Sequence, residues 1–201
     1  MSKAKNNKEK ILQTVTKKHI LRVRSLRESS ARTQLSRLVK VGKIQRLSRG
    51  VYALPDADFS EFQSLAITCL TLPNAVVCLI SALHFHDLTT QIPKEIWLAI
   101  KTNSRTPRFN QFPVRFLWYS PKALSTGVTT VMIDGVPVKI FNPAKTIVDC
   151  FRYRHKIGMD VCLEALREGW RKRLFSMDEL WKYAKICRVS TVIRPYLEAL
   201  V

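Results

Sequence analysis

The stretch from residue 30 to residue 49 reads SARTQLSRLVKVGKIQRLSR and concentrates hydroxyl, amide and cationic side chains. A guanidinium can donate two parallel hydrogen bonds to guanine, and a glutamine amide can pair in the same way with adenine. We therefore expect Arg32 and Gln34 to read bases, with about 1–3 kcal/mol of discrimination for each good pair. The predicted DNA-binding residues are Ser30, Arg32, Thr33, Gln34, Arg37, Lys40, Lys43, Arg46 and Arg49.

The other members of this set suit the DNA backbone, whose phosphates fix register without reporting sequence. Ser30, Thr33, Arg37 and Lys40 are expected to hold phosphates. The later residues of the set lie on a basic hairpin, from which arginines can reach the backbone or the minor groove. Upstream, Arg22, Arg24 and Arg27 add positive surface.

Other groups that could do chemistry have simpler explanations. His84 and His86 are two residues apart, so on a helix they point to nearly opposite faces and cannot share an ion. Lys145 and Asp149 are four apart, which favours a surface ion pair over a catalytic pair. Thr146 beside them is explained equally well by helix packing. The sequence therefore predicts no catalytic residue, no metal site and no cofactor.

A nuclease is the natural enzymatic alternative for a basic chain. Its metal-dependent forms often place an acidic residue two positions before a lysine, and no Asp or Glu of this sequence has that neighbour. With six glycines the chain also lacks a GxxxxGK phosphate loop. Trp97, Trp118 and Tyr119 could stack on bases, although strand aromatics usually belong to a core. The pattern favours a protein that is not an enzyme and leaves nucleic-acid processing as the weaker alternative.

The elements that would position the basic residues follow from apolar spacing and turn residues. Leu35, Leu38 and Val39 form one stripe of a helix that Gly42 should end in a left-handed conformation. A turn with Gly50 joins two short strands. The predicted order is a helix at 8–17, a strand at 19–21, helices at 22–28 and 31–41, and strands at 44–47 and 51–54. This is the order of a winged helix-turn-helix, in which the third helix enters the major groove and the hairpin is the wing.

A polar break at 55–58 predicts a boundary between a winged-helix domain, 1–56, and a mixed α+β domain, 57–201. Asn142-Pro143 and Ser176-x-x-Glu179 are strong helix starts. Asp134-Gly135 suits a two-residue hairpin turn. Expected helices cover 61–72, 82–88 with Ser81 as cap, 143–154, 160–174, a run from 177 and a last turn at 195–200. Expected strands cover 75–80, 95–101, 113–120, 129–134 and 136–141. The fold class is thus α+β, with a small sheet and C-terminal helices after the winged helix.

The net charge of the 201-residue chain is +19, and residues 1–59 carry +11 of it. Such asymmetry indicates a polyanionic partner for that end. No apolar run approaches the roughly 20 residues that cross a bilayer, and the charged start lacks a secretory signal. The five cysteines are odd in number and form no CxxC, which favours free buried thiols in a reducing compartment. We expect a cytoplasmic protein that does not associate with membranes.

Several segments resemble the AbiE-type abortive-infection antitoxins, and together they extend from about residue 8 to the end. The first is RLVKVGKIQRLSRGVYALP (37–55), with the Arg-Gly-Val-Tyr that closes the N-terminal module of that family. The others are SALHFHDL (81–88), NPAKTIVDCFRYRHKIGMDVCLEALRE (142–168) and MDELWKYAKICRVSTVIRPYLEAL (177–200).

The resemblance implies a bacterial phage-defence antitoxin whose operon also encodes a nucleotidyltransferase toxin. The N-terminal domain would repress that operon by binding inverted repeats in double-stranded DNA, as two copies of a monomer or weak dimer. The C-terminal domain would counteract the toxin, directly or indirectly. Its expected surface for this role is Arg152, Tyr153, Arg154, Arg171 and Arg173. The alternative that stays open is a winged-helix regulator without a toxin partner.

Overall fold

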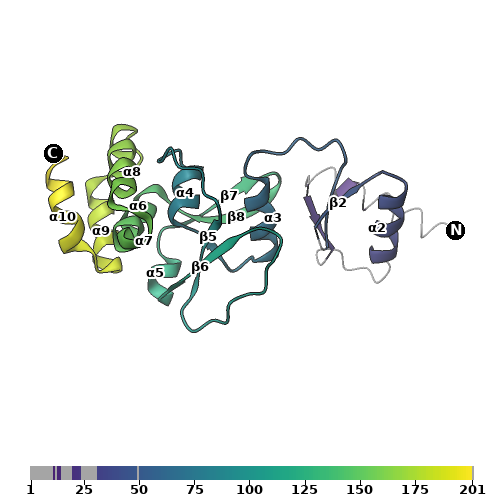
Figure 1. Ribbon diagram of the computed structural model, residues 1–201, viewed down its shortest axis with the longest axis horizontal. Helices are drawn as coiled ribbons and strands as arrows, with labels where there is room; N and C mark the ends of the chain where they lie inside the picture. Colours follow the sequence, from purple (N-terminus) through teal and green to yellow (C-terminus); the bar gives the residue numbers. More distant parts are fainter. Residues whose placement is uncertain (1–10, 12, 15–19, 24–30, 49, 201) are drawn as a thin grey trace. The chain divides into compact units, whose positions relative to one another are not determined.

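The structure is a computed structural model that describes residues 11, 13–14, 20–23, 31–48 and 50–200. The described chain divides into two compact units (Figure 1). The first holds the described residues of Met1–Thr71 and Met132–Pro137, and the second those of Leu72–Val131 and Val138–Val201. The predicted domain boundary after residue 56 lies within the first unit and stays a prediction.

The first unit contains a small antiparallel sheet and a helix packed on it. Its strands are β1 (Ile20–Arg22), β2 (Gln45–Ser48) and β3 (Val51–Ala53), in the order β1-β3-β2. Helix α2 (Ala31–Lys40) precedes the β2–β3 hairpin, and α3 (Gln63–Thr71) follows it. The core of this part is built from Ile11, Leu21, Leu35, Leu38, Ile44 and Tyr52. The strand, helix and hairpin expected here are confirmed.

The two helices expected before α2 are described in part. Ile11, Gln13 and Thr14 are helical, in agreement with the helix expected over 8–17, whose other residues lie outside the described part of the chain. Of the helix expected over 22–28, Arg22 belongs to β1 and Val23 has a 3₁₀ conformation. Residues 24–28 of that helix are outside the described residues.

The second sheet is mixed and has the order β6-β5-β4-β8-β7. Its strands are β4 (Val76–Val77), β5 (Ile96–Lys101), β6 (Val114–Tyr119), β7 (Val128–Ile133) and β8 (Val136–Phe141). Strand β4 pairs antiparallel with β5 and parallel with β8, and β5 pairs parallel with β6. The turn between β7 and β8 has Asp134 at φ 48° and Gly135 at φ 73°, as a two-residue hairpin turn requires.

Two parts of this region differ from the sequence prediction. The strand expected over 75–80 ends at Val77, and helix α4 (Leu79–Phe85) begins two residues before Ser81, so that Ser81 lies inside the helix and not at its cap. Ser81 instead accepts a hydrogen bond from the backbone N–H of Trp97 at 3.0 Å. Helix α5 (Pro121–Ser125), capped by Ser120, was not predicted. An apolar run such as AVVCLI suits a buried strand and a buried helix equally, which explains the first error.

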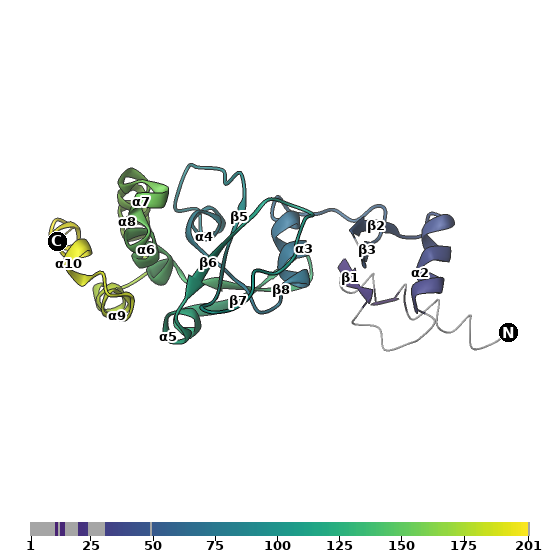
Figure 2. The ribbon, with the colours of Figure 1, turned by 60° about the horizontal axis from the view of Figure 1, so that its bottom comes forward.

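The C-terminal helices gather around α6 (Pro143–Arg152), which packs against α4, α8 and α9 (Figure 2). The Asn142 side chain caps α6, and Ser176 and Glu179 form the predicted capping box. The remaining helices are α7 (Arg154–Ile157), α8 (Met159–Arg171), α9 (Met177–Cys187) and α10 (Ser190–Glu198), the last longer than expected. The fold class, a winged helix-turn-helix followed by an α+β part, is confirmed. Within the described residues, no helix has the length and apolarity needed to cross a membrane.

Candidate nucleic-acid interface

Helix α2 has one face in the core and the opposite face in solvent. Leu35 and Leu38 are 0% and 1% exposed and anchor the helix on the small sheet. The predicted contact residues Arg32, Thr33, Arg37 and Lys40 are all exposed. The helix has no acidic residue in its first turn, and Arg37 and Lys40 occupy its last turn. The exposed face is therefore cationic along its length and suited to contact phosphates and base edges.

The end of α2 is fixed by its backbone. The N–H of Gly42 donates to the Val39 carbonyl, and the N–H of Lys43 donates to the Leu38 carbonyl, both at 3.0 Å. These are the two bonds of a Schellman motif, with Gly42 at φ 68° in the left-handed position. The motif turns the chain directly into the hairpin, and it leaves Lys43 exposed at the base of the wing.

The hairpin presents Arg46 on its exposed side. The Nε of Arg46 donates to the Ser48 carbonyl at 3.1 Å, and the register shifts between these two residues. Such an irregularity bends a strand and redirects its side chains. Ser30 and Arg49, the other hydroxyl and the other wing arginine of the predicted set, lie outside the described residues.

Gln34 occupies a different environment from its neighbours on α2. Its side chain is half-buried, and among the described residues its Oε1 has no hydrogen-bond partner. An amide in this position must move outward before it can pair with a base. Its contact with adenine stays a prediction, as do the individual contacts of the other residues.

A cleft of about 590 Å³ opens between α2 and the small sheet. It is lined by Arg22, Val23, Arg32, Ser36, Arg46, Gly50 and Tyr52. Arg22 comes from β1. The sequence analysis expected this residue to add positive surface and did not include it among the DNA-binding residues. Sequence spacing gave no signal for this cleft, because its arginines come from three elements that meet only in the folded unit.

The Lys145–Asp149 pair is the main correction in the second unit. The prediction of a surface ion pair is wrong, since both side chains are 0% exposed. The Lys145 ammonium bonds to the Asp149 carboxylate and lies 4.1 Å from the ring centroid of Phe141. Burial raises the pKa of Asp149, and Lys145 opposes that rise. Both side chains therefore belong to the core of the second unit.

The residues expected to form the antitoxin surface lie at the ends of two helices. The Arg152 guanidinium lies 5.5 Å from the ring centroid of Tyr153, and Arg154 donates to the Phe151 carbonyl. At the end of α8, Arg171 pairs with Glu168, and Arg173 is exposed. Arg152 and Tyr153 are thus in contact. The assignment of all five residues to the antitoxin surface remains a prediction.

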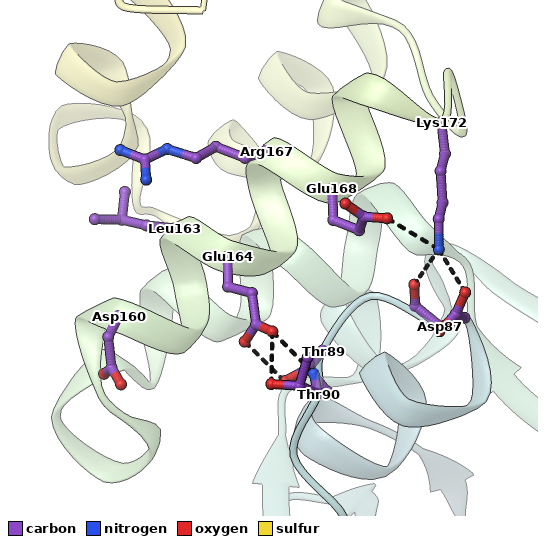
Figure 3. Close-up of a pocket in the computed structure, with 9 residues that line it drawn as sticks. All are labelled: Asp87, Thr89, Thr90, Asp160, Leu163, Glu164, Arg167, Glu168 and Lys172. Carbon is purple, nitrogen blue, oxygen red and sulfur yellow. Dashed lines mark hydrogen bonds and ion pairs between the residues drawn. The ribbon is translucent and has the colours of Figure 1, made fainter.

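A second cavity, of about 680 Å³, lies between α8 and residues 87–90 (Figure 3). Glu164 accepts hydrogen bonds from both Thr90 and Thr89, and Lys172 bridges Asp87 and Glu168. Arg171 and Lys172 lower the pKa of Glu168 to about 2. The pairing of Lys172 with Asp87 and the bonds of Glu164 to the two threonines tie the loop to the helix. We regard this cavity as a structural junction.

No group of three His, Cys, Asp or Glu side chains that could hold a metal occurs in the described part of the chain. The Nε2 of His86 lies 2.7 Å from the Phe141 carbonyl. Because a carbonyl can only accept, Nε2 carries the proton in that contact. His86 therefore ties the end of α4 to the end of β8. Of the three aromatic residues considered for stacking, Trp97 and Tyr119 are buried, and Trp118 is exposed.

Comparison with known proteins concerns the first unit. Residues 10–55 match the family model described as "Transcriptional regulator, AbiEi antitoxin". The match covers the described α2 and the β2–β3 hairpin, and it confirms the resemblance for this part of the chain. The resemblance of the segments after residue 55 stays a prediction. The curated proteins contain no match to the chain.

Proposed function

We propose that the protein represses its own operon by binding inverted repeats in duplex DNA, and the proposal starts from the match of residues 10–55 to the model of AbiEi antitoxin transcriptional regulators. The observation that carries the proposal is the division of α2 into two faces. Leu35 and Leu38 fix the helix on the sheet, while Arg32, Arg37 and Lys40 face solvent. A rigid, cationic helix beside a basic hairpin is the arrangement by which winged helices bind the major groove.

In this proposal some of the exposed side chains contact bases and the others contact phosphates. Arg32, near the start of α2, donates to a guanine edge, and Thr33, Arg37 and Lys40 hold phosphates. Arg46 approaches the backbone from the wing. One winged helix covers one half-site, so an inverted repeat takes two copies of the chain.

Binding is tested with the full chain and the DNA that precedes its gene. Footprinting locates the site, and fluorescence anisotropy compares that duplex with a scrambled one of equal length. Arg32→Gln should lower the preference for the natural site by about 1–3 kcal/mol. Arg105→Gln, an exposed arginine of the second unit, is the matched control and should leave that preference unchanged.

Salt and stoichiometry complete the test of the repressor. Affinity should fall steeply as salt rises, because phosphate contacts release counterions. Native mass spectrometry should find two chains on a duplex with both repeats and one chain on a duplex with a single repeat. Equal affinity for natural and scrambled duplexes would contradict the proposal.

The second part of the proposal is that residues after the winged helix counteract a nucleotidyltransferase toxin. The cations and the aromatic ring for this role come from two places in the chain. One is the junction of α6 and α7, and the other is the end of α8; the residues are Arg152, Tyr153, Arg154, Arg171 and Arg173. Co-expression with the neighbouring toxin gene tests it: Arg154→Gln with Arg173→Gln should reduce protection of growth. The absence of a nucleotidyltransferase gene in the operon would contradict the proposed antitoxin activity and would leave the proposed repression unaffected.

We further propose that the protein is not an enzyme. Support comes from the match of residues 10–55 to a family of transcriptional regulators and from the burial of Lys145 and Asp149, the pair first considered for catalysis. Incubation of the full chain with duplex DNA, RNA and divalent cations should leave the nucleic acids intact. Robust cleavage or nucleotide transfer would overturn this statement.

A further inference from the structure

The connection between β5 and β6 has an unusual form for two parallel neighbours. Parallel strands need a crossover that returns along the sheet, and this crossover usually contains a helix. Here residues 102–113 make the return without helix or strand (Figure 1). Connections of this length without secondary structure are uncommon in compact domains, and those that occur commonly carry function. The loop is therefore a candidate for a role beyond joining the two strands.

Both ends of the loop are fixed by backbone hydrogen bonds. At its start, the N–H of Thr102 donates to the Tyr119 carbonyl at 2.8 Å, and Asn103 has a left-handed conformation with φ 63°. At its end, the Pro113 carbonyl accepts a hydrogen bond from the N–H of Ile96 at 2.8 Å. The loop thus leaves and rejoins the sheet at defined positions.

The loop and the strands beside it are cationic. No Asp or Glu occurs in the sequence between Glu95 and Asp134, whereas Arg105 and Arg108 lie within the loop. Both arginines are exposed, and neither has a hydrogen-bond or ion-pair partner among the described residues. The Nε of Arg115, by contrast, lies 2.5 Å from the Glu95 carboxylate. Each loop guanidinium therefore keeps its five N–H donors available for a ligand.

Trp118 of β6 supplies an aromatic ring next to this loop. Its side chain is 46% exposed, while Leu117 and Tyr119, on the other face of the strand, are buried in the core. The indole Nε1 donates to the Ser104 carbonyl at 3.3 Å, which holds the ring against the start of the loop. Arg105 follows Ser104 directly, so its backbone lies beside the indole. An exposed ring of fixed position and an unpaired guanidinium are thus brought together.

These groups suit a nucleic acid whose bases are not paired. Proteins bind single strands by stacking bases on aromatic rings and by holding the phosphates with cations. In a duplex the bases are stacked on one another, whereas unpaired bases can stack on aromatic side chains. Phe109 and Phe112 add two half-buried rings to the loop, with centroids 6.4 Å apart. The combination of rings and cations therefore favours a single strand over a duplex.

We propose that Trp118, Arg105 and Arg108 form a binding surface for single-stranded nucleic acid. A base stacks on the Trp118 indole, and the two arginines hold phosphates of the same strand. RNA and single-stranded DNA share this chemistry. The surface uses none of the residues of α2 or the β2–β3 hairpin, and binding to it does not depend on the proposed repression.

The test of Trp118 uses the full chain with Arg32→Gln and Arg37→Gln, so that α2 contributes less to the binding of single strands. Fluorescence anisotropy measures the affinity of this parent chain for labelled oligouridylate and oligothymidylate of about 12 nucleotides. Adding Trp118→Ala should weaken binding by roughly 5–150-fold, the factor that corresponds to one stacked base. Trp118→Phe, which keeps a ring, should recover part of the loss. Tighter binding of oligouridylate would identify RNA as the ligand, and equal binding would identify single strands of either kind.

The two arginines are tested through the salt dependence of the same binding. Arg105→Gln with Arg108→Gln should reduce the slope of log affinity against log salt by about 1.4, because each phosphate contact on a single strand contributes about 0.7. The control is Lys139→Gln with Arg167→Gln, which removes the same charge from exposed positions of the second unit. The control should change the slope much less. On duplexes, Arg105→Gln should still leave the site preference unchanged.

Three results would overturn the proposed surface. The first is equal affinity of the parent and the Trp118→Ala chain for both oligonucleotides. The second is a similar loss of affinity for the duplex that precedes the gene when Trp118→Ala is made in the wild-type chain, which would assign the ring to duplex binding. The third is an unchanged salt slope after loss of both arginines, and this result decides alone if Trp118→Ala lowers the melting temperature. None of these results removes the proposed repression, which depends on site preference among duplexes.

Discussion

Lys145 carries a positive charge into the centre of the second unit. Its ammonium bonds to Asp149 and lies 5.1 Å from the ring centroid of Tyr119, while the thiol of Cys187 donates to Asp149 at 3.3 Å. The side chain also closes the space beside Gly127, where an added Cβ would lie 2.7 Å from the Cβ of Lys145. The pair is thus enclosed on several sides, and each charge depends on the other for compensation.

Removing one partner of this pair should be costly. Asp149→Ala leaves a buried ammonium without its carboxylate, for which we expect a loss of about 3–5 kcal/mol in the free energy of unfolding. The double variant Lys145→Met with Asp149→Leu should regain most of that loss, since an apolar pair needs no desolvation of charge. Urea unfolding measures both variants.

The exposed pair of Arg171 and Glu168 gives the control. The Arg171 side chain is 73% exposed, so water screens the pair and its removal should change the free energy of unfolding much less than removal of Asp149 does. A similar small loss for Asp149→Ala would show that the buried pair contributes little to stability.

His86 should make stability depend on pH. Burial lowers the pKa of His86 below 6.5, partly offset by its bond to the Phe141 carbonyl. The unfolded chain therefore binds this proton more readily than the folded chain. The stabilisation is complete above about pH 6.5 and is lost as the pH falls through the lower folded pKa. Urea unfolding at a series of pH values should show the decline, and His86→Gln should reduce its slope. An unchanged slope in the variant would assign the decline to other groups.

At the scale of elements, the position of α2 depends on how the helix ends. Gly42→Ala places a Cβ on a residue with φ 68°, and no described atom lies within 4 Å of that Cβ. The cost should therefore come from the backbone alone, about 1–2 kcal/mol. Gly42→Asn should cost less, because asparagine tolerates the left-handed region better. Thermal unfolding compares the two variants, and equal stability of Gly42→Ala and wild type would argue against the Schellman motif.

Elements with local signals were predictable from the sequence. Gly42, Asn142 and Ser176 end or begin helices through their own backbone and side chains, so no distant contact is needed to place them. The start of α4 was not predictable in this way, because AVVCLI carries no cap or turn residue between strand and helix. Burial of the Lys145–Asp149 pair was missed for a related reason. A spacing of four residues places two side chains on the same face of a helix. It does not tell whether that face will be buried in the core.

The sequence predicted the parts of the candidate interface that lie on a single helix or a single hairpin, and it did not predict the cleft between them. The exposed arginines of α2 follow from the apolar stripe, which fixes the opposite face. The cleft does not follow, since its lining residues are far apart in sequence and β1 and β2 come into one sheet only by pairing with β3. Half-burial of Gln34 likewise depends on what surrounds α2 in the folded unit.

At the scale of the whole molecule, the division into two compact units makes it possible to test the proposed repression and the proposed antitoxin activity separately. Arg32→Gln with Arg37→Gln changes solvent-facing residues of α2 and leaves Leu35 and Leu38 in the core. We expect this variant to lose repression of a reporter fused to the operon promoter while it still protects cells that express the toxin. Loss of both activities in a chain with normal melting temperature would show that neutralisation requires DNA binding.

All five thiols are sealed from solvent: Cys69 in the first unit, and Cys78, Cys150, Cys162 and Cys187 in the second. Burial raises the pKa of Cys69 to about 12, so at neutral pH an alkylating reagent finds almost no thiolate there. Iodoacetamide will consequently modify each cysteine only when local unfolding exposes its thiol to solvent. The rate at which iodoacetamide adds mass to the cysteines of each unit then reports how often that unit opens locally.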